Sequence, residues 1–233
     1  MSNISLSRQI GAILMIIGTE IGAGILALPI LVAHFGFLIG VVLLVTIWLL
    51  MTYTTFVICD INLSMPAGAS FAGMANRFFG YTGRVIVWVF FILILYPILI
   101  AYISAAGSAF NEILNISDGS ASLLFVVILS GFVLGGTSKV DYINRILLGT
   151  KLVLLFFICI VLIPHASSSF LLAVKQIHIK FLLLALPVLI TSFVGHIIIP
   201  TIRVYLNSDI KVLKRVIWIG TSIPFFLYLV WLI

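Results

Sequence analysis

Long stretches without a charged residue dominate this sequence and restrict it to folds that form in lipid. Residues 35–59 and 85–110 contain no Lys, Arg, Asp or Glu, and each is longer than the ~20 apolar residues that a helix needs to cross the hydrocarbon core. The chain is 64% hydrophobic and only 8% charged, whereas a soluble domain is about 25% charged. We therefore predict an all-α integral membrane protein, because helices satisfy their own backbone hydrogen bonds in lipid.

Apolar runs of spanning length occur about seven times. The predicted spans are residues 9–31, 35–59, 85–110, 119–138, 146–164, 181–202 and 216–233. Residues 60–83 are predicted to form a loop with a short amphipathic helix in the membrane interface, and residues 165–180 an outer loop with a similar helix. We treat 1–233 as one transmembrane domain.

The placement of basic residues predicts the orientation of these spans. With the N-terminus inside, the cytoplasmic segments carry nine Lys and Arg residues and the outer segments carry two, Lys175 and Lys180. An excess of Lys and Arg in short loops marks the cytoplasmic side, so we expect a cytoplasmic N-terminus. Basic residues placed singly between apolar runs do not form the patch that nucleic acid requires, and we expect no such partner.

Motifs for catalysis, metal binding or nucleotide binding are missing from the sequence. The two cysteines, Cys59 and Cys159, form no CxxC or Cys/His cluster, and His34, His165 and His178 fall in predicted outer loops. The sequence has no HExxH, P-loop or nucleophile elbow. We therefore predict a protein that is not an enzyme and has no metal or cofactor.

Three glycines and an acid interrupt the first span. Gly18, Gly22 and Gly24 lie within seven residues, and Glu20 lies between them. Each interior glycine costs a helix up to about 1 kcal/mol relative to alanine, so this segment is predicted to be unwound. Unwound backbone at membrane depth is tolerated only beside protein or a water-filled cavity, which indicates a cavity here.

The sixth span repeats this pattern. The spacing Gly24-x4-Pro29 recurs as Gly195-x4-Pro200, 171 residues later. Five predicted spans lie in one such repeat, and an odd number inverts the second repeat relative to the first. Glycine-interrupted helices at corresponding positions of two repeats indicate a transporter binding site. The alternative is that the glycines only allow close helix packing.

The residues around these breaks resemble the hydroxy/aromatic amino acid permease family, within the amino acid–polyamine–organocation superfamily. Five segments resemble the tyrosine- and tryptophan-permease branch of this family in their order and spacing, and together they extend over nearly the whole chain. They are GTEIGAGILALP (18–29), AYISAAG (101–107), VDYINRILLGTKLVLLF (140–156), ALPVLITSFVGHIIIP (185–200) and IGTSIP (219–224).

This resemblance implies a five-plus-five inverted repeat of the leucine-transporter type, with helices 1 and 6 broken. Residues 1–164 would form the first repeat, and 181–233 the first two helices of an incomplete second repeat, with a missing C-terminal portion as a partner. The implied function is proton-coupled import of tyrosine or tryptophan across a bacterial inner membrane. The alternative is a truncated, non-transporting membrane fragment or scaffold.

The resemblance also assigns candidate substrate-binding residues at the two breaks. Backbone N–H groups at a helix end favour a carboxylate, and two aromatic side chains would wall a pocket for an aromatic substrate, although such residues are more often simple packing residues. The candidates are Gly18, Thr19, Ile21, Gly22, Ala23, Gly24, Tyr102, Phe193 and Gly195.

Three ionisable residues within the spans are candidates for proton coupling, since an ionisable group in the bilayer is a functional hypothesis by default. They are Glu20, Lys151 and His196. The alternatives are a neutral carboxyl bonded to broken backbone, a lysine that reaches the membrane surface, and a packed core histidine. The family usually has a small or hydroxyl residue in place of Glu20, and glycine where this chain has Val194 and Ile197.

Overall fold

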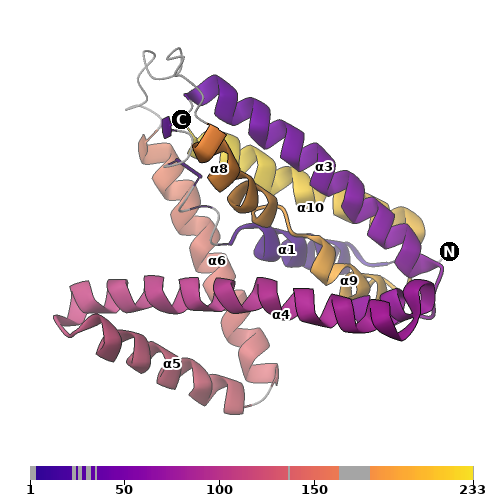
Figure 1. Ribbon diagram of the computed structural model, residues 1–233, viewed down its shortest axis with the longest axis horizontal. Coiled ribbons are helices and arrows are strands. Elements are labelled where there is room, and N and C mark those ends of the chain that lie inside the picture. The colour runs from indigo at the N-terminus through magenta and orange to yellow at the C-terminus, as the bar shows by residue number, and fades with distance from the viewer. Residues whose placement is uncertain are drawn as a thin grey trace. The chain divides into compact units, whose positions relative to one another are not determined.

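The computed structural model describes residues 4–22, 25, 28–29, 33–34, 36–135, 137–162 and 179–232. All regular secondary structure in these residues is helical (Figure 1), which confirms the predicted all-α class. The elements are α1 (Leu6–Glu20), α3 (Phe37–Leu63), α4 (Phe71–Leu114), α5 (Asp118–Leu134), α6 (Thr137–Leu162), α8 (Ile179–Thr191), the 3-10 turn η2 (His196–Ile198), α9 (Ile199–Tyr205) and α10 (Ile210–Trp231).

Four segments of the described chain are long and apolar enough to cross a bilayer. They are Phe37–Leu63, Phe71–Leu114, Ile179–Tyr205 and Ile210–Trp231, which correspond to four of the seven predicted spans. The fourth and fifth predicted spans coincide with the shorter apolar helices Asp118–Leu134 and Ile146–Ile158. In the first predicted span, α1 covers residues 6–20. The chain is thus a multi-span helical protein.

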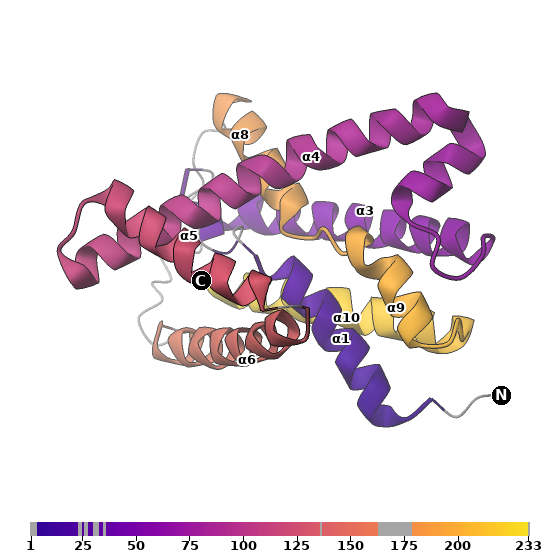
Figure 2. The same cartoon turned by 90° about the horizontal axis from the view of Figure 1, so that it is seen from below.

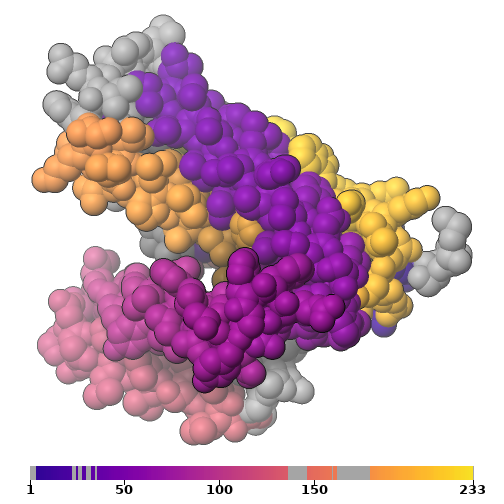
Figure 3. All heavy atoms as spheres, turned by 45° about the vertical axis from the view of Figure 1, so that its right-hand side comes forward, coloured from indigo at the N-terminus to yellow at the C-terminus, as the bar shows by residue number. Residues whose placement is uncertain are grey.

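The chain divides into two compact units. The first contains residues 1–87 and 159–233, and the second contains residues 88–158. In the first unit, α10 packs against α1 and α3, and α3 also packs against α8 and α9. Figures 2 and 3 show α3, in purple, beside the orange α8 and α9. This unit contains both predicted helix breaks.

Two clusters of buried apolar side chains form the core of the first unit. One includes Ile16 of α1 and Ile199 of α9, and the other includes Phe193 and Tyr228. Helices α1 and α10 approach closely at Gly220, where a Cβ atom would lie 2.8 Å from Cδ1 of Ile16. Each break is flanked along the chain by residues of both clusters. Ile16 precedes the first break and Leu28 follows it, and Leu189 precedes the second break and Ile199 follows it.

The structure corrects the predicted loop at residues 60–83. Helix α3 continues to Leu63 and α4 begins at Phe71, so only residues 64–70 connect the two helices. The short amphipathic helix exists as the first part of α4, which bends at Gly80, where φ is 64° and ψ is −161°. Such a positive φ suits glycine, which lacks the Cβ that would clash.

The start of the last described helix also differs from the prediction. Helix α10 begins at Ile210 rather than near residue 216, because the Asp209 side chain caps it. One Asp209 carboxylate oxygen accepts hydrogen bonds from the backbone N–H groups of Lys211 and Val212, each at 3.1 Å. A capping carboxylate at a helix N-terminus stabilises the first turn, which extends this helix through the basic residues that precede the apolar run.

In the second unit, the later part of α4 and α5 form a hairpin. Gly107 lies so close to Ser122 that an added Cβ atom would clash with the serine hydroxyl, and Phe110 and Phe125 meet edge to face, with centroids 6.0 Å apart. The predicted outer loop at 165–180 lies largely outside the described residues, as do His165 and His178. His34 is exposed and stacks on Phe181, with ring centroids 4.3 Å apart.

Candidate functional site

The first predicted break begins immediately after Glu20. Helix α1 ends at this residue, and Ile21 has φ −78° and ψ 77°, which is not helical. The N–H of Gly22 then donates to the carbonyl of Glu20 at 2.8 Å, forming a tight turn instead of another helical bond. The interruption predicted for the first span is therefore present.

Four of the candidate residues around this break are placed differently or not described. Gly18 and Thr19 lie in the last turn of α1, before the break. The exposed Thr19 side chain donates its hydroxyl to the carbonyl of Ile16 at 2.7 Å, which is a bond within its own helix. Ala23 and Gly24 lie outside the described residues.

The second break separates α8 from α9. Helix α8 ends at Thr191, and residues 192–195 form a turn and an irregular stretch before η2 begins at His196. Ser192 is fully buried and donates its hydroxyl to the carbonyl of Val188 at 2.8 Å, while the N–H of Gly195 donates to the carbonyl of Phe193 at 2.9 Å. The interruption predicted for the sixth span is present as well.

The two breaks meet at the carboxyl group of Glu20. This side chain is only 1% exposed, and a Cβ atom added at Gly195 would lie 2.5 Å from its Oε1. Neither carboxyl oxygen has a hydrogen-bond partner within the described residues. A buried polar group without a partner costs about 1–3 kcal/mol, and more if it is charged, so this carboxyl is costly to retain unless it binds something.

Two side chains of α10 donate hydrogen bonds to backbone carbonyls at the first break. The Tyr228 hydroxyl donates to the carbonyl of Glu20 at 2.7 Å, in a fully buried position, and the Trp231 indole N–H donates to the carbonyl of Ile25 at 2.6 Å. Sequence reasoning missed both residues. The available signal was a tyrosine and a tryptophan inside an apolar run, because these rings carry a polar group that needs a partner when buried.

The side chain of His196 is anchored to α3. Its Nε2 lies 2.7 Å from the hydroxyl oxygen of Thr54. That hydroxyl also lies 3.0 Å from the carbonyls of Leu50 and Met51, and it has a single hydrogen to donate. When Thr54 donates to its own helix, Nε2 of His196 must carry the hydrogen, so the histidine tautomer and the threonine rotor are linked.

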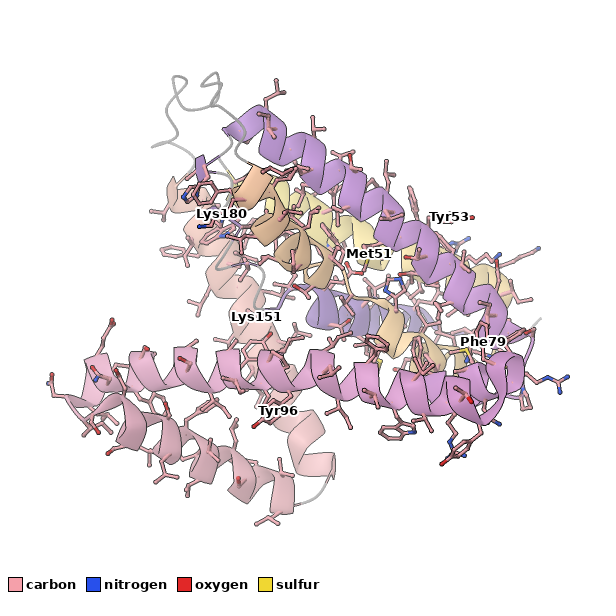
Figure 4. All side chains as sticks on the ribbon, in the orientation of Figure 1. Met51, Tyr53, Phe79, Tyr96, Lys151 and Lys180 are labelled. Carbon is pink, nitrogen blue, oxygen red and sulfur yellow. The ribbon has the colours of Figure 1, made fainter. Side chains whose placement is uncertain are left out.

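The remaining candidates divide between the two units. Phe193 is 1% exposed and packs edge to face on Tyr228, with centroids 5.5 Å apart, so its ring belongs to the core beside the first break. Tyr102 and Lys151 belong to the second unit. Tyr102 lines a shallow apolar groove on α4 together with Tyr96, and Lys151 is partly buried on α6 (Figure 4). The first unit therefore brings together Glu20, Gly195 and Phe193.

Acidic and metal-ligating side chains do not cluster in this region. Among the described residues, no group of three or more His, Cys, Asp or Glu side chains could hold a metal ion. The site in the first unit thus consists of the Glu20 carboxyl, Gly195 beside it and the interrupted backbone. Such a site can hold a small polar ligand through hydrogen bonds and charge.

Replacing Tyr228 with phenylalanine tests whether α10 stabilises the first break. We expect the free energy of unfolding to fall by about 0.5–1.5 kcal/mol, because one buried hydrogen bond is lost while the Glu20 carbonyl keeps the N–H of Gly22 and the ring packing is kept. Equilibrium unfolding in detergent micelles measures this loss. Tyr53→Phe is the control, since Tyr53 is 68% exposed and points away from α3 (Figure 4); equal effects of the two changes would contradict the expectation.

Comparison with known proteins identifies the family. The tryptophan/tyrosine permease family matches residues 6–233. A tyrosine-specific transport system 1 of Haemophilus influenzae is 33% identical over 228 residues, covering 97% of this chain and 57% of that protein. A tryptophan-specific transport protein of the same organism is 30% identical, covering 95% of this chain and 57% of that protein. A glutamine transporter 2 of Aliivibrio fischeri is 29% identical, covering 97% of this chain and 60% of that protein.

No solved structure matches this chain. The chain spans a little over half the length of these curated relatives, and the match begins near its first residues and continues to residue 233. A family match over so much of the chain, together with a multi-span helical fold, is decisive for its classification. The chain belongs to the tryptophan/tyrosine permease family.

Proposed function

We propose that this chain takes part in secondary import of an aromatic amino acid, tyrosine or tryptophan, across a bacterial inner membrane, and that it catalyses no chemical reaction. One observation carries the proposal, which is the meeting of two interrupted helices at a buried carboxyl that has no hydrogen-bond partner among the residues the structure describes. Several relatives are named as tyrosine or tryptophan transport proteins, which supports an aromatic substrate.

The spacing of the breaks supports an inverted-repeat arrangement. Glu20 and Thr191 are the last residues of α1 and α8, and 171 residues separate them, the same separation as that between Pro29 and Pro200. We therefore assign residues 1–164 to a first repeat of five helices and 181–233 to the start of a second. Corresponding breaks in two such repeats are the usual place for a substrate.

Interrupted backbone at both breaks would hold the polar groups of the substrate. In the described residues, the N–H groups of Ile21, Gly22 and Gly195 donate to the carbonyls of Ile17, Glu20 and Phe193, so these bonds must open before the same N–H groups can bind the substrate carboxylate. The ring of Phe193 is the proposed aromatic contact to the side chain of the substrate.

Proton coupling is assigned to Glu20, Lys151 and His196. Glu20 lies at the meeting point of the breaks, and the hydrogen bond between His196 and Thr54 gives a route by which a change at η2 reaches α3.

The orientation in the membrane is assigned from the basic residues of the first unit. Arg8, Lys211 and Arg215 are exposed and lie near the starts of α1 and α10. We assign this end to the cytoplasm.

Uptake into proteoliposomes tests the proposal. The full chain is reconstituted, and accumulation of radiolabelled tyrosine, tryptophan and serine is measured with and without an imposed proton gradient. We expect gradient-dependent accumulation of tyrosine or tryptophan. We expect Glu20→Gln to abolish that accumulation, because the amide keeps the shape of the side chain but cannot exchange a proton, and Lys151→Met to remove its pH dependence.

Glu112→Gln is the matched control, because it makes the same chemical change at an exposed position. Unchanged accumulation in Glu20→Gln would remove this carboxyl from the mechanism. Uptake that does not respond to the proton gradient would contradict symport. Failure of the chain to bind or accumulate any of the three amino acids would support the non-transporting alternative.

A further inference from the structure

The bend in α4 carries two arginines and three aromatic rings within eight residues. We call residues 77–84 the Gly80 corner. Phe78, Phe79 and Tyr81 are 57%, 75% and 76% exposed, and Arg77 and Arg84 are exposed as well. Figure 4 shows Phe79 at the end of the fold where α4 begins. Three large rings on the outside of a turn are unfavourable in water, so this surface requires a partner.

The opposite side of this segment is fixed to the protein. Met74 and Ala75 are buried, and the fully buried Asn62 donates its side-chain amide to the Sδ of Met74 at 3.6 Å and to the carbonyl of Ala69 at 2.9 Å. The first turns of α4 are therefore attached to the end of α3. With that side occupied, the rings of the Gly80 corner face away from this attachment.

The charge of the corner is uncompensated by nearby acids. The sequence has no Asp or Glu between Asp60 and Glu112. Asp60 itself pairs with Lys214 at 2.9 Å, and neither Arg77 nor Arg84 forms an ion pair within the described part of the chain. Two arginines without acidic neighbours attract anions, and their planar guanidinium groups suit the oxygens of a phosphate.

Aromatic rings and basic residues next to a spanning helix indicate the boundary between lipid and water. The apolar run of α4 that can cross a bilayer continues directly from this corner. Tyrosine rings concentrate at the level of lipid headgroups, phenylalanine rings enter the boundary with the acyl chains, and basic residues there are attracted to anionic lipids. A lipid surface therefore satisfies the rings and the charges together.

We propose that the Gly80 corner is a binding site for an anionic phospholipid, independent of the transport function. Arg77 and Arg84 bind the phosphate of the headgroup, and the rings of Phe78, Phe79 and Tyr81 lie among the glycerol and upper acyl carbons. The positive φ of Gly80 makes the bend in α4 that separates Arg77 from Arg84 along the chain.

Lipid retention by the purified full chain tests this proposal. Native mass spectrometry counts phosphatidylglycerol and phosphatidylcholine molecules with identical acyl chains during titration into detergent-solubilised protein. We expect tighter binding of phosphatidylglycerol to the native chain. The double change Arg77→Gln and Arg84→Gln should weaken that binding about 25-fold, because each basic residue at a membrane surface contributes about fivefold.

The control is Lys211→Gln with Arg215→Gln, which removes the same charge from exposed positions on α10. An equal loss of phosphatidylglycerol from both double variants would overturn the proposal in favour of general attraction to a basic surface. Phe79→Ser should also weaken binding of the lipid but not of soluble glycerophosphoglycerol, and equal binding of lipid by Phe79→Ser and native protein would exclude the aromatic contact. Unchanged melting temperatures would show that the variants are folded.

Discussion

Replacing Gly195 with alanine is expected to stop gradient-driven uptake while leaving the fold nearly as stable as before. An added Cβ atom would lie 2.5 Å from Oε1 of Glu20, so the carboxyl must move. The backbone itself accepts alanine, since Gly195 has φ −77° and ψ −12°, which any residue adopts. The next-nearest atom outside Glu20 is a methyl carbon of Ile16 at 3.7 Å, an ordinary contact.

Gly195→Ala therefore changes the position of the Glu20 carboxyl without changing the stability of the helix break. Uptake in proteoliposomes should fall at least tenfold, which corresponds to about 1.4 kcal/mol of lost stabilisation, and the melting temperature should change little. Gly149→Ala is the control, because no atom lies within 4 Å of a Cβ at that position. Normal uptake by Gly195→Ala would mean that the position of the carboxyl beside this glycine is unimportant for transport.

Replacing Arg203 with alanine is expected to produce the largest loss of stability. Arg203 is 6% exposed and belongs to α9, yet its guanidinium group donates to the backbone carbonyls of Asn62 and Met65, the latter at 2.9 Å. It also donates to the hydroxyl of Ser208 at 3.2 Å. A positive charge beside the carbonyl end of α3 is stabilised by the helix dipole. Removing it takes the guanidinium donor from the Met65 carbonyl and one of the donors from the Asn62 carbonyl, which keeps the N–H of Met65.

We expect the free energy of unfolding to fall by about 3–5 kcal/mol, because a hydrogen bond to a charged group contributes about 1.5–3 kcal/mol and the bonds to both carbonyls are lost. Equilibrium unfolding in micelles provides the measurement. Arg203→Lys should recover only part of the loss, because an ammonium group cannot reproduce the fork of donors. Arg215→Ala, at an exposed position on α10, should change little, and an Arg203→Ala variant as stable as Arg215→Ala would contradict this account.

Sequence reasoning located the helix breaks because their causes are local. Gly22 and Gly195 weaken the helix where they stand, and the helices end within a few residues of them, at Glu20 and Thr191. Apolar length likewise predicted the spans of α3 and α10. The helix ends were less accurate, since the cap at Asp209 extended α10 beyond the apolar run from which its start was predicted.

Contacts between distant segments could not be predicted in this way. Arg203 was counted among the cytoplasmic loop charges, but it is buried because the end of α3 offers it carbonyl oxygens. Tyr228 and Thr54 had no local motif, and their roles depend on which helices are neighbours. The roles of the candidate site residues remain predictions, since spacing along one helix does not determine which residues of another helix face it.

The hydrogen bonds from α10 to the first break have a consequence for synthesis of the protein. The bond from Tyr228 to Glu20 joins residues 208 positions apart, and that from Trp231 to Ile25 joins residues 206 positions apart. A ribosome adds about 5–20 residues each second, so roughly 10–40 seconds pass between these partners. During that interval the carbonyls of Glu20 and Ile25 lack the donors that α10 supplies, so the first break reaches its final hydrogen bonding only after α10 has been made.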